Sequence, residues 1–600
     1  MGDGRAKRTH RAAGAPAEPA QNELSRRVWE ARYRHVPATD AVPERSLGET
    51  WDRVAHALAS VEARRRDAWQ SAFRRALDDF RFLPGGRILA GAGASSTATL
   101  ANCFVSGVLE DSTDVVFERL KESALTMQWG GGIGCDFTPL PPRGASAAGP
   151  VAYLRIWDAM CDAVSAGGSR RGAMMGTLRC DHPDIEQFID AKRAGHTLRN
   201  FNLSVLVTDA FMAALAADAK WPLRFPCAVA SASGETSPAV KPGAIVRLVQ
   251  ARSLWNRIVD SAYAAAEPGV LFIDRINRHN NLRALEQIAT TNPCGEVPLP
   301  PNGVCMLGSL NLPAFVRGAF TEGAELDVAA LDAAVPTAVR MLDDAIELSL
   351  YPVEAQALEA RATRRIGLGV TGLADALIML GLRYDSEDAR GFARSVVARI
   401  RDAAYRASAD LAQQKGSFPR FDCDAYLASV NARSLPAAIR GRIARHGLRN
   451  SHLIAIAPAG SISLLANNVS SGIEPVFAVR AERRVVDAAG TAADCTVEDY
   501  AYALFRAEHS EALPPAFVTA EELTSEAHLE MVAALQPLVD GGISKTINVP
   551  ADISRAAFAG IYERAYALGL KGCSVFRPNE TTGSVLKRAA GSCCGASERR

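Results

Sequence analysis

The 600-residue sequence lacks several features that mark particular classes of protein. None of its twelve cysteines forms a Cys-x-x-Cys pair, which argues against a zinc ribbon or a thioredoxin-type motif, and we assign no metal ligands. The formal net charge is +1, so the composition predicts neither nucleic acid nor a membrane surface as a partner. No stretch has the roughly 20 predominantly apolar residues of a transmembrane helix, and the beginning lacks the apolar segment of a secretory signal. We therefore expect a cytoplasmic protein with mostly free thiols.

The apolar pattern divides the chain into a helical beginning and a long α/β region. The stretch "SLGE" (46–49) fits a helix-capping box, and Trp51, Val54 and Leu58 follow at helical spacing. Further on, short apolar runs such as "GVLFID" (269–274) alternate with helical segments, which is typical of an α/β fold with buried parallel strands. We predict a disordered tail over 1–21, a helical region over 22–95, one catalytic α/β domain over 96–585 and a flexible tail over 586–600.

The stretch "TNPCGEVPLPPNGVCMLGSLNL" (291–312) places a thiol between an amide and a carboxylate. Asn292, Cys294 and Glu296 occupy alternate positions, so on extended backbone they would face one space together. Pro293 disfavours a helix, and Gly295 lets backbone approach a ligand. The alternative is a buried structural cysteine, the commoner role of a lone cysteine. The amide and the carboxylate weaken that alternative, because neither is easily buried without partners.

Two glycine-containing loops have different interpretations. "PAGSIS" (458–463) follows the apolar run "LIAIA" and could hold phosphate through successive backbone N–H groups, although it lacks the ending of a Walker motif. Its alternative is an ordinary turn. "GLGVTG" (367–372) has the glycines of a dinucleotide-binding loop, but a charged helical run precedes it instead of a strand, so we assign it to tight packing.

Two further groups are candidates for anion binding and for thiol exchange. Arg170 and Arg171 lie in the glycine-rich "SAGGSRRGAMMG" (165–176), which could bind a phosphate or carboxylate or could be a solvated turn. Cys593 and Cys594 are adjacent near the end of the sequence. Such a pair suits a mobile thiol carrier, and the alternative is two incidental thiols.

Many ordered segments together resemble one family. They run from about residue 25 to 588 and include "RFLPGGRILAGAG", "NCFV", "QWGGGIGCDF", "RRGAMMGTLRCDHPDIEQFIDAK", "EPGVLFIDRIN", "NPCGE", "CMLGSLNL", "RRIGLGVTGLADAL", "SSGIEPVFA", "SKTINVP" and "KGCSVFRPN". This set closely resembles the ribonucleotide reductases, specifically the class II enzymes that depend on adenosylcobalamin. The resemblance implies a ten-stranded α/β barrel, with an N-terminal helical region and a flexible C-terminal tail. It also implies reduction of ribonucleotides, diphosphates first among them, to 2′-deoxyribonucleotides for DNA synthesis.

The resemblance gives roles to the alternating triplet. Cys294 would become a thiyl radical at the tip of a finger loop inside the barrel and remove the 3′-hydrogen of the substrate. Glu296 would take the 3′-hydroxyl proton, which a carboxylate within hydrogen-bond reach can do. Asn292 would hold the substrate in register.

The resemblance also implies a relay of thiols. Cys103 and Cys305 stand where the family has the pair that supplies two electrons and becomes a disulfide. Cys593 and Cys594 resemble the tail dithiol that reduces this disulfide again by thiol–disulfide exchange. Thioredoxin or glutaredoxin would then restore the tail.

Nucleotide contacts carry over in the same way. The predicted phosphate loop consists of Ala459, Gly460, Ser461 and Ile462. The two predicted substrate-lining positions are Asn102 and Gly132. Part of the predicted deoxynucleotide effector site is Asp111, Ser112 and Thr113. The Arg170–Arg171 segment resembles the loop that links this site to the substrate.

Several departures bear on the radical source and on regulation. Reductases with a separate radical subunit carry two adjacent tyrosines near the C-terminus, whereas the corresponding "LKGCSVFRPNE" (570–580) has none. The chain also has no Asp-x-His-x-x-Gly cobalamin motif, in keeping with class II members, whose cofactor does the radical chemistry. Pro141 replaces an arginine expected to help hold the effector, and the first specificity loop is short. Fewer than 50 residues precede the first clear helix, so we expect no ATP-binding cone.

Two alternatives stay open at this point. The chain could be a large subunit that a separate radical-generating subunit serves, or a non-catalytic paralogue that only binds nucleotides. Its assembly could be a monomer or a homodimer.

Overall fold

The structure is a computed structural model, and it describes residues 21–37, 42–94, 98–144, 148–165, 173–193, 197–225, 243–486, 492–579 and 587–588. Three helices form its first region: α1 (Glu23–Arg32), α2 (Leu47–Ala59) and α3 (Arg66–Leu77). The predicted cap of α2 is present, since the Ser46 side chain accepts a hydrogen bond from the N–H of Glu49. The Glu49 carboxylate also accepts a hydrogen bond from the N–H of Arg45 (2.6 Å). Trp51, Val54 and Leu58 are buried, as their helical spacing predicts.

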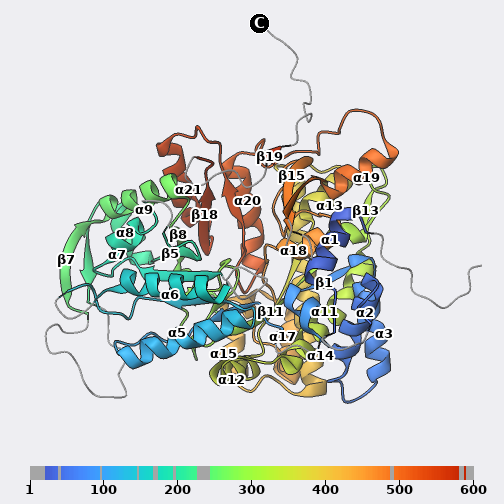
Figure 1. The fold of residues 1–600 in the computed structure, drawn as a ribbon, viewed down its shortest axis with the longest axis horizontal. Coiled ribbons are helices and arrows are strands. Elements are labelled where there is room, and N and C mark those ends of the chain that lie inside the picture. The colour runs from blue at the N-terminus through green and yellow to red at the C-terminus, as the bar shows by residue number, and fades with distance from the viewer. Residues whose placement is uncertain are drawn as a thin grey trace, which may run out of the picture.

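A ten-stranded, mostly parallel sheet forms the centre of the molecule (Figure 1). Its strands, in spatial order, are β1 (Phe82–Pro84), β11 (Val304–Asn311), β2 (Cys103–Val105), β3 (Gly132–Asp136), β4 (Met174–Arg179), β5 (Phe201–Val207), β8 (Gly269–Phe272), β18 (Gly572–Phe576) and β17 (Thr546–Asn548), with β14 (Ile366–Thr371) paired to β11. The α/β fold is therefore confirmed.

The pairing pattern closes this sheet into a barrel made of two parallel halves. In the first half β2, β3, β4, β5 and β8 are parallel neighbours, and this half meets the second antiparallel at β11 and at β18. In the second half β14 runs parallel to β11 and continues through the isolated bridges Leu368↔Ile454 and Ile456↔Ile543. Ile543 lies shortly before β17, which pairs with β18. The two ends of the sheet therefore meet.

Helices cover the outside of the barrel on both halves. In Figure 1, α5 (Thr113–Gln128), α6 (Pro150–Ser165) and α9 (Ala251–Ala265) lie on the side of β5 and β8, and α11 (Val328–Leu348) and α14 (Glu387–Lys415) lie on the other side. The other helices of at least six residues are α4 (Gly86–Gly91), α7 (Ile185–Asp190), α8 (Asp209–Ala216), α10 (Ile273–Arg278), α12 (Glu354–Thr363), α13 (Leu373–Met379), α17 (Ala437–His446), α18 (Gly460–Leu465), α19 (Tyr500–Glu508), α20 (Ser525–Leu535) and α21 (Arg555–Ala567). Within the described ranges, no helix combines the length and the apolar character needed to cross a membrane.

Smaller sheets lie outside the barrel. They pair β6 (Lys220–Arg224) with β7 (Ile245–Gln250), β12 (Val316–Arg317) with β13 (Glu325–Leu326), and β15 (Arg480–Val486) with both β16 (Ala492–Glu498) and β19 (Lys587–Arg588).

A hairpin of β9 (Thr290–Thr291) and β10 (Pro298–Leu299) carries the predicted catalytic triplet at its tip. Backbone packs closely on both of its sides. A Cβ at Gly134 of β3 would lie 1.8 Å from the carbonyl oxygen of Thr291, and one at Gly542 would lie 2.8 Å from that of Gly295. Only glycine fits such close approaches, so these two positions let the hairpin pass through the barrel.

The glycines of "GLGVTG" serve packing, as predicted. They lie in and directly after strand β14 rather than in a nucleotide-binding turn. A Cβ at Gly369 would come within 2.5 Å of the carbonyl oxygen of Ala455, on the neighbouring segment of the barrel.

Candidate active site

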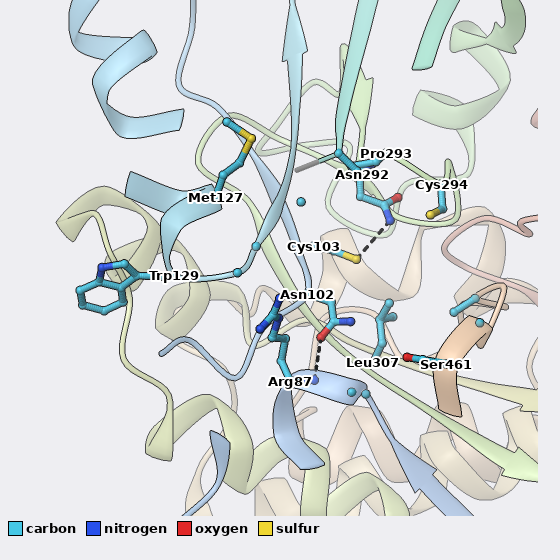
Figure 2. A pocket seen from close by; sticks show the side chains of 18 of the residues that line it. Arg87, Asn102, Cys103, Met127, Trp129, Asn292, Pro293, Cys294, Leu307 and Ser461 are labelled. Atoms are coloured by element: carbon cyan, nitrogen blue, oxygen red, sulfur yellow. Dashed lines mark hydrogen bonds between the residues drawn. The ribbon is translucent and has the colours of Figure 1, made fainter. Parts of the chain in front are cut away.

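A cavity of about 820 Å³ surrounds the tip of the hairpin (Figure 2). Its wall contains ten of the predicted catalytic and substrate-binding residues: Asn102, Cys103, Gly132, Asn292, Cys294, Glu296, Ala459, Gly460, Ser461 and Ile462. They come from β2, β3, the hairpin and the start of α18, which are far apart in the sequence. The barrel therefore gathers these predicted residues into one site.

The tip of the hairpin is a turn, so the prediction of extended backbone over the triplet is wrong. The N–H of Gly295 donates to the carbonyl oxygen of Asn292 (3.1 Å), which closes a four-residue β-turn. Asparagine, proline and glycine at the first, second and fourth positions are favoured in such turns, and "NPCG" has all three. The turn presents Cys294 at its outer corner, while Asn292 and Glu296 lie on its two sides.

Asn292 holds this turn together and reaches a second thiol. Its side-chain oxygen accepts a hydrogen bond from the N–H of Val297 (2.9 Å), across the base of the loop. Its amide nitrogen donates to the sulfur of Cys103 (3.1 Å), as the dashed line in Figure 2 shows. The side chain is 1% exposed, so both contacts are made away from water.

Glu296 is a buried carboxyl group with a perturbed proton affinity. Burial raises the pKa of Glu296 from 4.5 to about 7, against the hydrogen bonds from Asn292 and Cys103. The thiol of Cys103 lies 3.9 Å from Oε1, while Oε2 is buried with no hydrogen-bond partner. A carboxyl group that changes charge near neutral pH is suited to accept and return a proton.

Cys294 borders two cavities at once. It is an exposed cysteine that forms no disulfide and, with Pro293 and Pro458, it lines both the large cavity and a second one of about 360 Å³. The second cavity is walled by residues of β8, β17 and β18 and by Pro293, Cys294 and Gly295 of the hairpin turn. A thiol in this position can face two different bound molecules.

Comparisons with known proteins point to one family over nearly the whole chain. A family model described as "Ribonucleotide reductase, barrel domain" matches residues 101–576, and one described as "Ribonucleotide reductase, all-alpha domain" matches residues 20–97. The chain belongs to the ribonucleotide reductase family.

Relatives within the family have more specific names. A "Vitamin B12-dependent ribonucleoside-diphosphate reductase" of Mycobacterium tuberculosis is 36% identical over 582 residues, which cover 91% of this chain and 78% of the relative. A protein of the same name from Thermoplasma acidophilum is 36% identical over 540 residues, or 86% of this chain and 66% of the relative. A "Ribonucleoside-diphosphate reductase subunit alpha" of Chlamydia pneumoniae is 28% identical over 478 residues, or 71% of this chain and 45% of the relative.

The two predicted electron-donating thiols of this reductase lie opposite each other on two adjacent strands. Cys103 of β2 and Cys305 of β11 are direct partners in the antiparallel register. Side chains directly opposite in this way have Cβ atoms about 4.5–5.5 Å apart, so a small adjustment brings them to disulfide distance. Burial raises the pKa of both thiols well above the ordinary value, and the nearby Glu296 carboxylate raises that of Cys103 further. Both are therefore neutral thiols that still hold their hydrogen atoms.

The predicted phosphate loop lines the same cavity of this reductase as the hairpin tip. Ala459 adopts a left-handed conformation (φ 52°) directly before helix α18, and nothing lies within 4 Å of the position that a Cβ on Gly460 would take. Ser461 projects its hydroxyl group at the cavity wall (Figure 2).

Other predicted residues lie elsewhere. Asp111, Ser112 and Thr113 form the start of α5, where Ser112 is the N-cap, and they line neither of the two cavities. Their predicted effector role is consistent with a separate site and stays a prediction. Arg170, Arg171, Cys593 and Cys594 lie outside the residues that the structure describes.

The structure adds residues that the motifs alone did not single out. Arg87 lines the large cavity, and its backbone N–H donates to the side-chain oxygen of Asn102 (3.4 Å). Its guanidinium group fills the space where a side chain at Gly130 would lie. Lys571 lines the second cavity, fully buried, and donates to the carbonyl oxygens of Val539 (3.1 Å) and Asp540 (2.8 Å). "PGGR" and "LKG" were visible in the sequence, but nothing local indicates that these segments meet the site.

Proposed function

We propose that this chain reduces ribonucleoside diphosphates to 2′-deoxyribonucleoside diphosphates, with adenosylcobalamin as its radical source. The observation that carries the proposal is the position of Cys294, whose side chain borders both the cavity with the predicted substrate residues and a second, smaller one. A radical-transferring thiol must contact the radical source on one side and the sugar on the other. The printed names of the relatives at 36% identity support both the substrate class and the cofactor.

The second cavity suits the reactive part of that cofactor. At Gly295 (φ 82°) nothing lies within 4 Å of a Cβ position, so the turn leaves open space beside Cys294. Ser544, Lys545 and Ser574 supply polar groups to the same wall, and Pro298 and Val575 supply apolar surface. We assign these residues to holding the adenosyl side. When bound, adenosylcobalamin supplies one-electron chemistry that protein side chains lack.

The residues of the large cavity account for the remaining steps. Cys294, as a thiyl radical, takes the 3′-hydrogen atom of the ribose and becomes a thiol. Glu296 accepts the 3′-hydroxyl proton, because its pKa of about 7 leaves much of it ionised at neutral pH. At the end Cys294 returns the hydrogen atom to C3′, and Glu296 returns the proton to the 3′-oxygen.

Loss of the 2′-hydroxyl as water requires one proton for that group and two electrons, which the thiols of Cys103 and Cys305 supply as they become a disulfide. One thiol hydrogen leaves with the hydroxyl as water and the other is taken up on C2′. The cross-strand pairing of the two cysteines supports this role. The Asn292 amide, which contacts Cys103 at 3.1 Å, would orient the sugar hydroxyl groups beside that thiol.

The nucleotide would lie across the cavity. We assign the phosphate groups to residues 459–462, with the hydroxyl of Ser461 as a donor, and the sugar and base to the side of Asn102 and Gly132. We also propose a deoxynucleotide effector at the start of α5 and a thioredoxin or glutaredoxin as the reductant of the Cys593–Cys594 tail, in a cytoplasmic location. The alternative is a radical supplied by a partner subunit. The relative from Chlamydia pneumoniae, whose name calls it a subunit alpha, supports this alternative.

One assay tests the function and separates it from the alternative. The purified chain is incubated without oxygen with CDP, dithiothreitol and adenosylcobalamin, and dCDP is measured without any second protein. We expect dCDP only when the cofactor is present. Absence of dCDP under these conditions, with activity appearing only when a radical-generating subunit is added, would overturn the proposal.

A further inference from the structure

The N-terminal helical region reaches the phosphate loop directly. Helix α1 lies beside helix α18, as Figure 1 shows, although more than 400 residues separate them in sequence. The backbone N–H of Asn22 donates to the side chain of Asn467 (2.8 Å), and the hydroxyl of Ser25 donates to the carbonyl oxygen of Leu465. These contacts hold the C-terminal end of α18.

A third contact holds the other end of α18, at the cavity. Tyr33, the residue that follows α1, donates its phenol hydrogen to Oγ of Ser461 over 2.6 Å. Its ring lies against Gly86, where a Cβ would be 3.2 Å from the phenol oxygen. Gly86 and Ser461 both line the cavity, so the phenol group stands directly behind its wall.

Tyr33 is held rigidly in this position. The residue is 3% exposed, and its backbone N–H donates to the carbonyl oxygen of Trp29 (2.9 Å). Its own carbonyl oxygen accepts from Arg53, which also donates to the carbonyl oxygen of Leu89 (3.0 Å) and pairs with Glu44 at 2.7 Å. The direction of the phenol group is therefore set by the surrounding structure.

We propose that Tyr33 is a positioning residue for recognition of the substrate phosphates. A serine hydroxyl has one hydrogen to donate and two lone pairs to accept with. The phenol is the stronger acid and takes the donor role, so it occupies one lone pair of Ser461 and leaves the serine hydrogen for another acceptor. With the phenol behind it, that hydrogen is directed into the cavity, toward a phosphate oxygen. This inference rests on the phosphate site of the proposed function.

The test replaces Tyr33 with phenylalanine, which keeps the ring and removes only the donor. The net contribution of a typical hydrogen bond corresponds to about fivefold in affinity, so misdirecting the serine hydroxyl should cost about that factor. We expect Tyr33→Phe to raise the KM for CDP, its Kd and the inhibition constant of inorganic pyrophosphate by about that factor, with kcat changed less than twofold. Ser461→Ala should have a similar effect, and the double variant should be no weaker than Ser461→Ala alone, because both changes remove one function.

Ser25→Ala is the matched control. It also removes one hydroxyl between α1 and α18, but its partner Leu465 does not line the cavity. We expect it to lower the melting temperature while leaving the affinities for CDP and pyrophosphate as in the wild type. Unchanged affinities in Tyr33→Phe, or an equal loss in Ser25→Ala, would overturn the proposal in favour of simple bracing.

The outcomes also separate this proposal from the proposed function. If the wild type makes no dCDP but its pyrophosphate affinity depends on Tyr33 as described, the reaction assignment fails and the positioning role stands. If the wild type makes dCDP and Tyr33→Phe matches it in every constant, the positioning role alone fails.

Discussion

Replacing Glu296 with glutamine should lower turnover strongly and make the protein more stable than the wild type at pH 8. Burial raises the pKa of this carboxyl group from 4.5 to about 7 in the native state. The native state thus holds the proton more tightly than the unfolded chain, so the ionised wild-type side chain costs stability as pH rises from about 4.5 to about 7, and the cost is constant above that. Each pH unit of pKa difference is worth about 1.4 kcal/mol, which gives about 3 kcal/mol in total.

The assay is urea unfolding of wild type and Glu296→Gln between pH 5 and pH 8. Glutamine has the size of the carboxyl group and no charge, so the two proteins should differ little at pH 5. Between pH 5 and pH 7 the free energy of unfolding of the variant should rise relative to that of the wild type. At pH 8 the variant should be about 3 kcal/mol more stable. Its rate of dCDP formation should fall by a factor of about 10² to 10⁴, the usual contribution of a general base.

The control is Glu322→Gln, since Glu322 has an exposed side chain. It should show no such pH-dependent difference from the wild type. A stability difference for Glu296→Gln that is the same at pH 5 and pH 8 would exclude a raised pKa of Glu296, because the carboxyl group would then titrate alike in the native and unfolded states.

Three further predictions concern the barrel and the thiols. Gly134→Ala should destabilise the protein and lower turnover strongly, since its Cβ would lie 1.8 Å from a hairpin carbonyl oxygen. The control Gly391→Ala, with open space on helix α14, should raise the free energy of unfolding by about 0.5–1 kcal/mol. Thermal unfolding and dCDP assays measure both variants. Cys305→Ser should bind CDP as the wild type does and form no dCDP even with dithiothreitol; multiple turnovers would exclude its role as an electron donor. The double variant Cys593→Ser and Cys594→Ser should keep its rate with dithiothreitol and lose it with thioredoxin, because only the small reductant reaches the buried pair directly. Equal rates with both reductants in that variant would remove the tail from the relay.

Local patterns were sufficient to predict the first helical region and the α/β class. The helical spacing of Trp51, Val54 and Leu58 gave a buried helix face, and the alternation of apolar runs with helices gave the α/β class. These features depend on neighbouring residues, which is why the sequence alone reveals them. Closure of the barrel through Ile456 and Ile543 depends on distant pairing, and it was inferred only from the family resemblance.

The hairpin tip shows a misreading that the sequence itself could have prevented. Alternate positions suggested extended backbone, but "NPCG" is a favoured β-turn sequence, and the turn forms. The grouping of Asn292, Cys294 and Glu296 in one cavity was right for a different geometric reason.

Contacts between distant segments account for what the sequence did not predict. Tyr33 and Ser461 are 428 positions apart, and no local pattern connects them. The raised pKa of Glu296 likewise results from burial by the surrounding barrel rather than from its neighbours in the chain. Sequence motifs therefore point to candidate reacting groups, whereas the burial and proton affinity of those groups depend on the tertiary structure.

The most direct test of the central claim is dCDP formation by Cys294→Ser beside the wild type, with CDP binding measured on the same samples. If Cys294 carries the radical, the variant should bind CDP within about twofold of the wild-type affinity, because the thiol contributes little to binding, and it should form no detectable dCDP. Formation of dCDP by the variant at a measurable fraction of the wild-type rate would contradict the assignment of the radical to this sulfur.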